Sequence, residues 1–353
     1  MLETIEEASA CVLLEMYLVE SGIIAGRFIE SLARAAGRGV RVCVLLDGFG
    51  SLGLSQADRR RLLGAGVDLR FFNALHWRNR LRNFLRNHRK LLLADGRVAF
   101  VGGAGLTDEF AIGGPDGLPW RDLMLEIAGP VVADWQRAFA QTWRRAGGEL
   151  EVADPPVYPD NAAGATGRVS LSEARQRSVL ANGVIRRIEG ARARAWIMSA
   201  YFVPSRRFRK ALRRAARRGV DVRLIVPGPK TDHPWVRQAA RRFYGKMLRN
   251  GVRIFEYQPR VLHAKMIVCD EWVSIGSSNL DRWGIKWNLE ANQEIENAAC
   301  ADSAAAVLAA DCGRSEELSR RLWPRRAWIG RLQERIAGAL DRRLDRWRRP
   351  KAP

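Results

Sequence analysis

The sequence predicts a mixed α/β fold built from two similar lobes. Helical and strand patterns alternate along the chain, the same order of patterns occurs twice, and 353 residues exceed the size of an ordinary single domain. With 47% hydrophobic residues, the chain can form a substantial core in each half. We therefore expect a duplicated mixed β-sheet flanked by helices, with the active site between the two lobes.

The first repeated block is a helix followed by a strand. Apolar residues recur at helical spacing after residue 28, Gly39 ends the helix, and an apolar strand follows. The same pattern returns after residue 208, with Gly219 in the place of Gly39. A second helix and strand follow in each half, which indicates a single duplication rather than a short-period repeat.

Each half next contains the pattern His-x-Lys-x4-Asp, leading into a tight hairpin. The six residues are His88, Lys90 and Asp95 in the first half, and His263, Lys265 and Asp270 in the second. The chain has only 4 histidines, so two complete matches at corresponding places are a specific signal.

Strand geometry assigns different roles to the members of this pattern. Residues i and i+2 of a strand project from one face, so His88 and Lys90 converge on one spot, and the second half repeats the arrangement. A lysine beside a histidine suits a phosphate oxygen. Asp95, an odd number of residues past Lys90, faces the other side, where we expect it to stabilise the hairpin.

Composition shifts divide the chain into four segments. We expect a first lobe over residues 1–152, a linker rich in Pro, Gly and Ala over 153–178, and a second lobe over 179–318. Residues 319–353 combine arginines with apolar residues at helical spacing, which predicts a basic amphipathic helix.

The net charge of +21 points to a polyanionic partner, either nucleic acid or an anionic membrane. The 5 cysteines are scattered without a CxxC pair, which argues against a disulfide framework and a zinc site and fits a reducing compartment. Neither a signal peptide nor an apolar run of about 18 residues is visible, so we expect any membrane association to be peripheral.

The paired motifs, with Leu14-Glu-Met-Tyr17, Tyr201-Phe-Val-Pro204 and Gly276-Ser-Ser-Asn-Leu-Asp281, resemble the phospholipase D superfamily. The finer resemblance is to bacterial cardiolipin synthases, in particular the short forms without N-terminal transmembrane helices. It extends over nearly the whole chain, to about residue 300.

The resemblance implies a two-step transfer that uses neither a metal nor another cofactor. His88 would attack the phosphorus and form a phosphatidyl-histidine, while His263 would protonate the leaving alcohol and then deprotonate the acceptor. The resemblance further implies that a carboxylate orients each histidine, Asp122 for His88 and Glu290 for His263.

Two further residues are candidates to bind the phosphate, and one position differs from the pattern of the relatives. Closure of the second hairpin returns the chain to Ser277 and Asn279, which we expect to donate to the phosphate. In the first half, relatives commonly have an asparagine where this chain has Gly105, so one amide donor is missing. That departure leaves open a folded binding protein without activity.

The implied reaction transfers a phosphatidyl group from one phosphatidylglycerol to another and releases glycerol, at the cytoplasmic face of the membrane. A monomer suffices, since one chain supplies both motifs. The alternative is a phospholipase D or nuclease that uses water as acceptor. Tryptophans on the C-terminal helix favour an anionic membrane over nucleic acid. A helix packed on the second lobe remains the alternative for that segment.

The remaining candidates are weaker. His76 and His233 lack a motif lysine and are expected in solvated loops, whereas Tyr201 is a candidate to border the site. Residues 76–86 interleave arginines with aromatics just before the first motif, which is compatible with a solvated loop or with contact to a lipid headgroup.

Overall fold

The structure is a computed structural model, and it describes residues 1–76, 83–114, 117–151, 164–173, 179–281, 287–325, 334 and 336–339. The chain divides into two compact units, which are described one at a time. The first comprises Met1–Leu180, Ser274–Ser278 and Lys286–Glu296, and the second comprises Ala181–Val273, Asn279–Ile285 and Asn297–Pro353.

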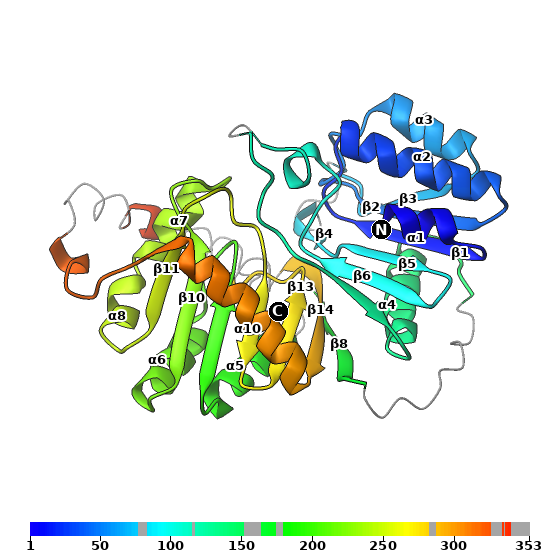
Figure 1. The fold of residues 1–353 in the computed structure, drawn as a ribbon. Coiled ribbons are helices and arrows are strands. Elements are labelled where there is room, and N and C mark those ends of the chain that lie inside the picture. The colour runs from blue at the N-terminus through cyan, green and yellow to red at the C-terminus, as the bar shows by residue number, and fades with distance from the viewer. Residues whose placement is uncertain are drawn as a thin grey trace, which may run out of the picture. The chain divides into compact units, whose positions relative to one another are not determined.

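The first unit contains a six-stranded mixed sheet with the strand order β3-β2-β1-β5-β6-β7 (Figure 1). Its parallel strands are β1 (Cys11–Met16), β2 (Arg41–Asp47) and β3 (Asp68–Phe72). The antiparallel strands that follow are β5 (Leu91–Ala94), β6 (Val98–Gly102) and β7 (Met124–Ala128).

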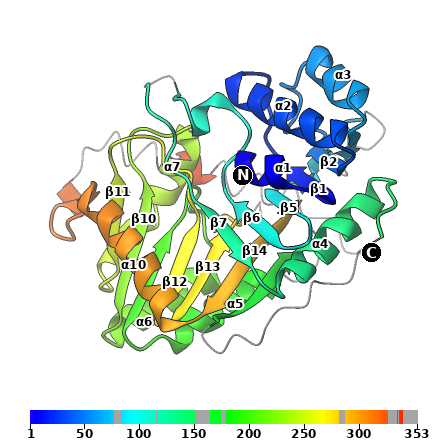
Figure 2. The same ribbon diagram turned by 45° about the vertical axis from the view of Figure 1, so that its right-hand side comes forward.

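Helices cover both faces of this sheet (Figure 2). The described helices of the unit are α1 (Leu2–Glu7), α2 (Ile23–Gly37), α3 (Gln56–Gly64), the 3-10 turn η2 (Asp108–Phe110) and α4 (Val132–Arg145). Alternate residues of β1 face opposite ways, so Leu14 joins an apolar cluster with α1, α2 and α3, whereas Leu13 joins a second cluster with α4.

Three more strands complete the first unit, and one of them comes from late in the chain. β14 (Asn288–Glu296) pairs in parallel with the short β4 (Arg86–Asn87) and antiparallel with β8 (Thr166–Ser172). The segment expected as a linker, 153–178, therefore contains a strand in its described part, and the expected second lobe contributes β14 to the first unit. This long-range pairing has no local signal in the sequence.

The second unit repeats the strand arrangement. Its sheet runs in the order β15-β11-β10-β9-β12, and β13 (Trp272–Gly276) begins in this unit and ends in the first. The strands are β9 (Arg194–Met198), β10 (Asp221–Pro227), β11 (Arg253–Tyr257), β12 (Met266–Cys269) and β15 (Ser315–Glu317). The described helices are α5 (Val179–Gly190), α6 (Arg206–Arg217), α7 (Pro234–Arg241), α8 (Tyr244–Leu248), α10 (Ala298–Gly313) and the 3-10 turn η3 (Trp323–Arg325).

The duplication predicted from the sequence is present in the structure. In both units three parallel strands are followed by an antiparallel strand that pairs with the first of them, β5 with β1 and β12 with β9. Gly39 and Gly219 follow corresponding helices with φ of 85° and 94°, a conformation that favours glycine at a helix end. The expected fold of two similar α/β lobes is confirmed.

Most of the expected C-terminal helix, 319–353, lies outside the described residues. In its described part, Trp323 packs against α8, with its ring centroid 5.6 Å from that of Tyr244. Glu334 pairs with Arg241 of α7 at 3.5 Å, and Ala337 is buried in a small apolar cluster. These positions pack on the second unit. No helix in the described part of the chain is long and apolar enough to cross a membrane.

Asp95 and Asp270 stabilise the hairpins of the two motifs. In the described part of the chain, the hydrogen-bond partners of both carboxylates are backbone N–H groups and, for Asp95, the hydroxyl of Ser9. Asp95 accepts hydrogen bonds from the backbone N–H groups of Ser9, Ala10 and Cys11 at 2.8–2.9 Å. Asp270 accepts the same set from residues 192–194 at 2.9–3.0 Å. The resemblance counts both aspartates with the catalytic motif, whereas their contacts agree with the hairpin-stabilising role that strand alternation predicted for Asp95.

We expect Asp95→Ala to lower the free energy of unfolding by about 1–2 kcal/mol, because three backbone donors lose a charged acceptor in a partly solvated setting. Burial raises the pKa of Asp95, but the hydrogen bonds from residues 9–11 outweigh it and lower the pKa overall. A lowered pKa means that this stabilisation is present above about pH 4 and is lost as the pH falls through the folded-state value.

Urea denaturation at pH 7 and at pH 3 measures this difference. Asp95→Asn is the matched control, since asparagine keeps the left-handed backbone (φ 52° at residue 95) and one acceptor oxygen. It should lose less stability than Asp95→Ala. Equal stability of wild type and Asp95→Ala at pH 7 would contradict the assigned role.

Candidate active site

The first motif histidine is held between two strands that are distant in sequence. His88 directly follows β4, and its backbone N–H donates to the carbonyl oxygen of Leu289 on β14 at 3.0 Å. The register of β14 places Glu290 beside the imidazole, where Oε2 lies 3.0 Å from Nδ1 of His88. Both side chains are buried, Glu290 completely. The pairing of β4 with β14 therefore builds a carboxylate–imidazole pair.

Neighbouring charges and hydrogen bonds lower the pKa of the carboxyl group of Glu290. Burial by itself raises the pKa of Glu290, but the charge and hydrogen bond of His88, the charge of Lys90 and the hydroxyl of Ser277 together lower it. Ser277 donates to Oε2 at 2.5 Å, and Asn288 donates to Oε1 at 3.3 Å. An ionised acceptor favours the tautomer of His88 that carries its proton on Nδ1, which leaves the lone pair on Nε2 for nucleophilic attack.

The assignment of carboxylates to histidines made from the sequence is wrong for Glu290. We expected Glu290 to orient His263 and Asp122 to orient His88, whereas Glu290 is the carboxylate that contacts His88. The reason is that β14 leaves the second half of the chain and pairs with β4. Asp122 lies just before β7, where its Oδ1 accepts the backbone N–H of Leu123 at 2.7 Å.

A tyrosine and a lysine complete the surroundings of His88. The ring of Tyr17 meets the imidazole edge-on, with the centroids 4.7 Å apart. Nζ of Lys90 lies 5.1 Å from the centroid of Tyr17 and donates to the carbonyl oxygen of His88 at 2.7 Å. Burial and the negative charge of Asp47 raise the pKa of Tyr17 to about 12, so its hydroxyl stays protonated.

The second unit holds the second motif in a similar way. His263 and Lys265 are both buried, and Nζ of Lys265 lies 2.8 Å from Nδ1 of His263. Lys265 also donates to the carbonyl oxygen of His263, as Lys90 does to that of His88. The ring of Tyr201 meets His263 edge-on at 5.9 Å, so Tyr201 does border this histidine. Each unit thus presents a histidine, a lysine and a tyrosine.

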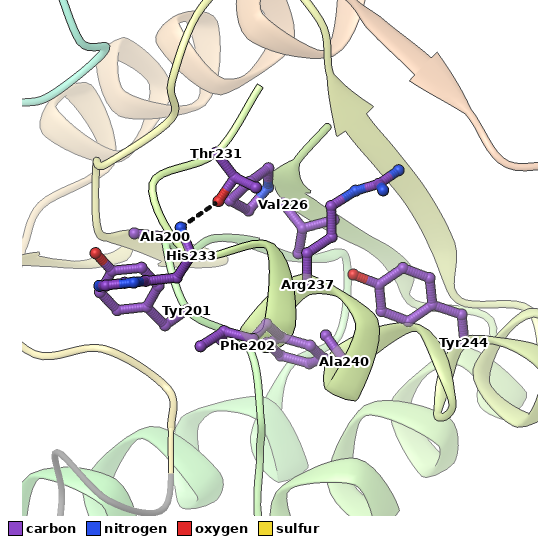
Figure 3. Close-up of a pocket in the computed structure, with 11 residues that line it drawn as sticks. Ala200, Tyr201, Phe202, Val226, Thr231, His233, Arg237, Ala240 and Tyr244 are labelled. Carbon is purple, nitrogen blue, oxygen red and sulfur yellow. Dashed lines mark hydrogen bonds between the residues drawn. The ribbon is translucent and has the colours of Figure 1, made fainter. Parts of the chain in front are cut away.

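A small pocket on the second unit extends from Tyr201 (Figure 3). The hydroxyl of Tyr201 donates to Asp232, and the ring of His233 contacts that of Tyr201 in a tilted arrangement, with the centroids 5.1 Å apart. The backbone N–H of His233 donates to Oγ1 of Thr231 at 3.3 Å. The side chain of His233 is 58% exposed. His76, the other histidine without a motif lysine, is also exposed.

The two residues expected to bind phosphate, Ser277 and Asn279, are both buried. The hydroxyl of Ser277 donates to Glu290 and accepts the backbone N–H of Ala291 at 3.1 Å. Ser277 therefore supports the carboxylate of the first motif in this structure, and its phosphate-binding role stays a prediction. Among the described residues, Oδ1 of Asn279 has no hydrogen-bond partner.

The backbone geometry explains the glycine at position 105. A Cβ atom there would lie 2.9 Å from the carbonyl oxygen of Leu18 and 3.0 Å from its Cβ. The asparagine expected from relatives would therefore need a shift of the backbone at Leu18, two residues after β1. Gly105 is thus a packing requirement of this chain, which weakens the argument that it marks a site that has lost its activity.

A comparison with family models and curated proteins agrees with the motifs. Residues 1–143 and 184–312 match the family described as cardiolipin synthase, PLD-like domain. Cardiolipin synthase A of Pseudomonas putida (strain W619) is 36% identical over 318 residues, 89% of this chain and 66% of that protein. Cardiolipin synthase A of Pseudomonas aeruginosa (strain LESB58) is 33% identical over 321 residues, 90% of this chain and 65% of that protein. The chain spans about two thirds of the length of these relatives.

Solved structures support the fold. A phosphatidylserine synthase of Haemophilus influenzae Rd KW20 superimposes with a TM-score of 0.72 at 11% identity, over 97% of this chain and 89% of that one. A polyphosphate kinase of Porphyromonas gingivalis gives 0.61 at 15% identity, over 91% of this chain and 46% of that one. At such identities the likeness concerns the fold.

We expect Glu290→Gln to lower the rate of any reaction in which His88 attacks phosphorus by roughly 10²- to 10⁴-fold, because an amide no longer favours the proton on Nδ1. Loss of the negative charge also makes His88 titrate at a lower pH. NMR titration of the histidine imidazoles, with turnover measured in parallel, checks both effects.

The matched control for Glu290→Gln is Glu296→Gln, at the exposed end of the same strand. It should change neither the titration nor the rate.

The pKa of Glu290 is lowered, so the contribution of Glu290 to folding stability exists above about pH 4 and is lost as the pH falls through the folded-state value. An unchanged titration of His88 in Glu290→Gln would contradict the pairing.

Proposed function

Because this chain belongs to the cardiolipin synthase family of phospholipase D-like domains, we propose that it is a phosphatidyltransferase that makes cardiolipin. The proposed reaction moves a phosphatidyl group from one phosphatidylglycerol to another and releases glycerol. The observation that carries the proposal is the buried pair of Glu290 and His88, with Lys90 beside it. This pair supplies an oriented imidazole next to a cation.

In the first proposed step, Nε2 of His88 attacks the phosphorus of phosphatidylglycerol. A P–N bond forms, the P–O bond to glycerol breaks, and glycerol leaves with a proton that we assign to His263. The developing imidazolium of His88 is stabilised by the carboxylate of Glu290. The product is a phosphatidyl-histidine.

The second proposed step reverses the first with a different alcohol. The hydroxyl of a second phosphatidylglycerol gives its proton to His263, its oxygen bonds to phosphorus, and the P–N bond to His88 breaks. Lys90 and Lys265 are suited to the phosphate oxygens as point charges. Asn279, with an Oδ1 that has no partner among the described residues, and Ser277 are further candidates for polar contacts to the substrate.

The proposed partner is an anionic membrane surface at its cytoplasmic face, where both substrates reside. The net charge of +21 supports it, because basic residues near anionic lipid each contribute about 1 kcal/mol. Exposed apolar side chains also support it, for example Trp235 on α7 at 64% and Leu322 at 59%. Both motifs lie in one chain, so a monomer is sufficient for the proposed reaction.

Incubation of the purified protein with phosphatidylglycerol vesicles tests this function. Cardiolipin and glycerol should form in a 1:1 ratio, and His88→Ala and His263→Ala should each lower the rate by roughly a thousandfold or more. Glu296→Gln is the control, since Glu296 lies at the exposed end of β14. It should leave the rate unchanged.

The other outcomes of this assay separate the alternatives. Phosphatidic acid in place of cardiolipin would identify a hydrolase that uses water as acceptor. Cleavage of DNA in the same protein preparation, lost in His88→Ala, would identify a nuclease. Absence of any product from a folded protein would contradict the enzymatic proposal and favour a binding protein.

A further inference from the structure

Buried polar side chains flank the first motif histidine, whereas apolar side chains flank the second. The neighbours of His88 in the chain are Asn87 and Arg89, which are 0% and 1% exposed. The neighbours of His263 are Leu262 and Ala264, which are also buried. Strand alternation turns these neighbours away from the face that carries the histidine.

The first sheet adds a buried carboxyl group next to Asn87. Nδ2 of Asn87 donates to Oε1 of Glu15 on β1 at 2.7 Å, and Glu15 is fully buried. The backbone N–H of Asn87 donates to Asp47 at the end of β2 at 2.8 Å. Asn87 is thereby tied to two strands, through its side chain and its backbone.

Arg89 ties the other side of His88 to a helix. Its Nη1 donates to Oγ1 of Thr142 on α4 at 2.8 Å, and that hydroxyl donates to the carbonyl oxygen of Ala138 at 3.1 Å. Burial lowers the pKa of Arg89, and the negative charge of Glu15 opposes this effect. Burial likewise raises the pKa of Glu15, against the charge of Arg89. Overall the pKa of Glu15 is raised and that of Arg89 is lowered, and the opposite charge of the other group limits each shift.

The position that corresponds to Glu15 in the second half is Met198. Glu15 lies opposite Leu91 in the pairing of β1 with β5, and Met198 lies opposite Met266 in the pairing of β9 with β12. Leu91 and Met266 both stand three residues after a motif histidine. Met198 is 1% exposed, so this position in the second unit is apolar and buried.

Hydrogen bonds and apolar contacts constrain a strand differently. A buried polar group that loses its hydrogen-bond partner lowers the stability by about 1–3 kcal/mol. A buried hydrogen-bonded network therefore favours a single position of the strand that carries it. Apolar neighbours of similar volume are exchanged at low cost and allow small adjustments. The backbone on both sides of His88 is thus fixed in direction, by β1 and β2 on one side and by α4 on the other.

We propose that Glu15, Asn87 and Arg89 are positioning residues for His88, and that this network suits one of the two histidines to act as the nucleophile. A nucleophile must approach phosphorus along a narrow angle, whereas a proton donor and acceptor serves two different alcohols in turn. The assignment of the nucleophile rests on the proposed function. The network itself rests on the contacts of the described residues.

The test gives two of the three positions the residue of the second half, with the double variant Glu15→Met/Arg89→Ala, and keeps Asn87. Each single variant leaves one buried charge without its opposite and should lower the melting temperature. The double variant removes both charges and should regain most of that loss. We expect its kcat for phosphatidyl transfer to stay at least tenfold below wild type, with KM within twofold.

A purely structural role predicts the opposite result. If the double variant regained kcat together with its melting temperature, the positioning role would be overturned. Thr142→Val tests the same point in a milder way, because it removes the hydroxyl that holds Arg89 and keeps the side-chain volume. It should lower kcat about three- to tenfold. Thr107→Val is the matched control, a buried hydroxyl without a partner among the described residues, and should not change kcat.

An NMR measurement separates failure of this inference from failure of the proposed function. In protein with ¹⁵N-labelled histidine, the Nδ1 proton of His88 should exchange slowly with water, because Glu290 accepts it in a buried site. The double variant and Thr142→Val should exchange it faster, whether or not wild type makes cardiolipin. Unchanged exchange in both folded variants would contradict the positioning role.

Discussion

The hydrogen bond between Glu290 and His88 is the interaction on which the active site depends. It joins residues 202 positions apart, and it exists because β14 pairs with β4. Burial by itself raises the pKa of the carboxyl group, yet the charge of His88 and the surrounding donors and cations lower it overall. The same strand pairing holds the backbone of His88 through Leu289 and brings Ser277 to the carboxylate. The pairing of β14 with β4 therefore determines where Glu290 lies, and through it the ionised carboxylate and the tautomer of His88.

The two halves share one scaffold, but they differ in the buried side chains that flank the motif histidine. Both keep the lysine that donates to the histidine carbonyl, the tyrosine at the imidazole edge and the aspartate that binds the start of the first strand. Only the first half has Glu15, Asn87 and Arg89 as these side chains, where the second half has Met198, Leu262 and Ala264. In the proposed reaction the two histidines perform different tasks, and the difference in their support is consistent with that division.

Much of this architecture was predictable from the sequence, because it rests on local patterns. The helix–strand repeats predicted two α/β lobes, and the motif spacing identified His88, Lys90, His263 and Lys265. The opposite orientation of Asp95 also followed from strand alternation. The partner of His88 was not predictable, since the pairing of β14 with β4 depends on contacts distant in sequence. For the same reason β8 was mistaken for part of a linker: it is held by pairing with β14, and the residues before it are rich in Pro, Gly and Ala.

The central claim is that Glu290 prepares His88 as the nucleophile, and trapping the intermediate tests it most directly. The protein is mixed with phosphatidylglycerol vesicles, quenched during turnover with denaturant at alkaline pH, and digested for mass spectrometry. The account predicts a phosphatidyl group on the peptide that contains His88, absent from His88→Ala and strongly reduced in Glu290→Gln. An adduct on His263, or cardiolipin formation without any adduct on His88, would contradict it.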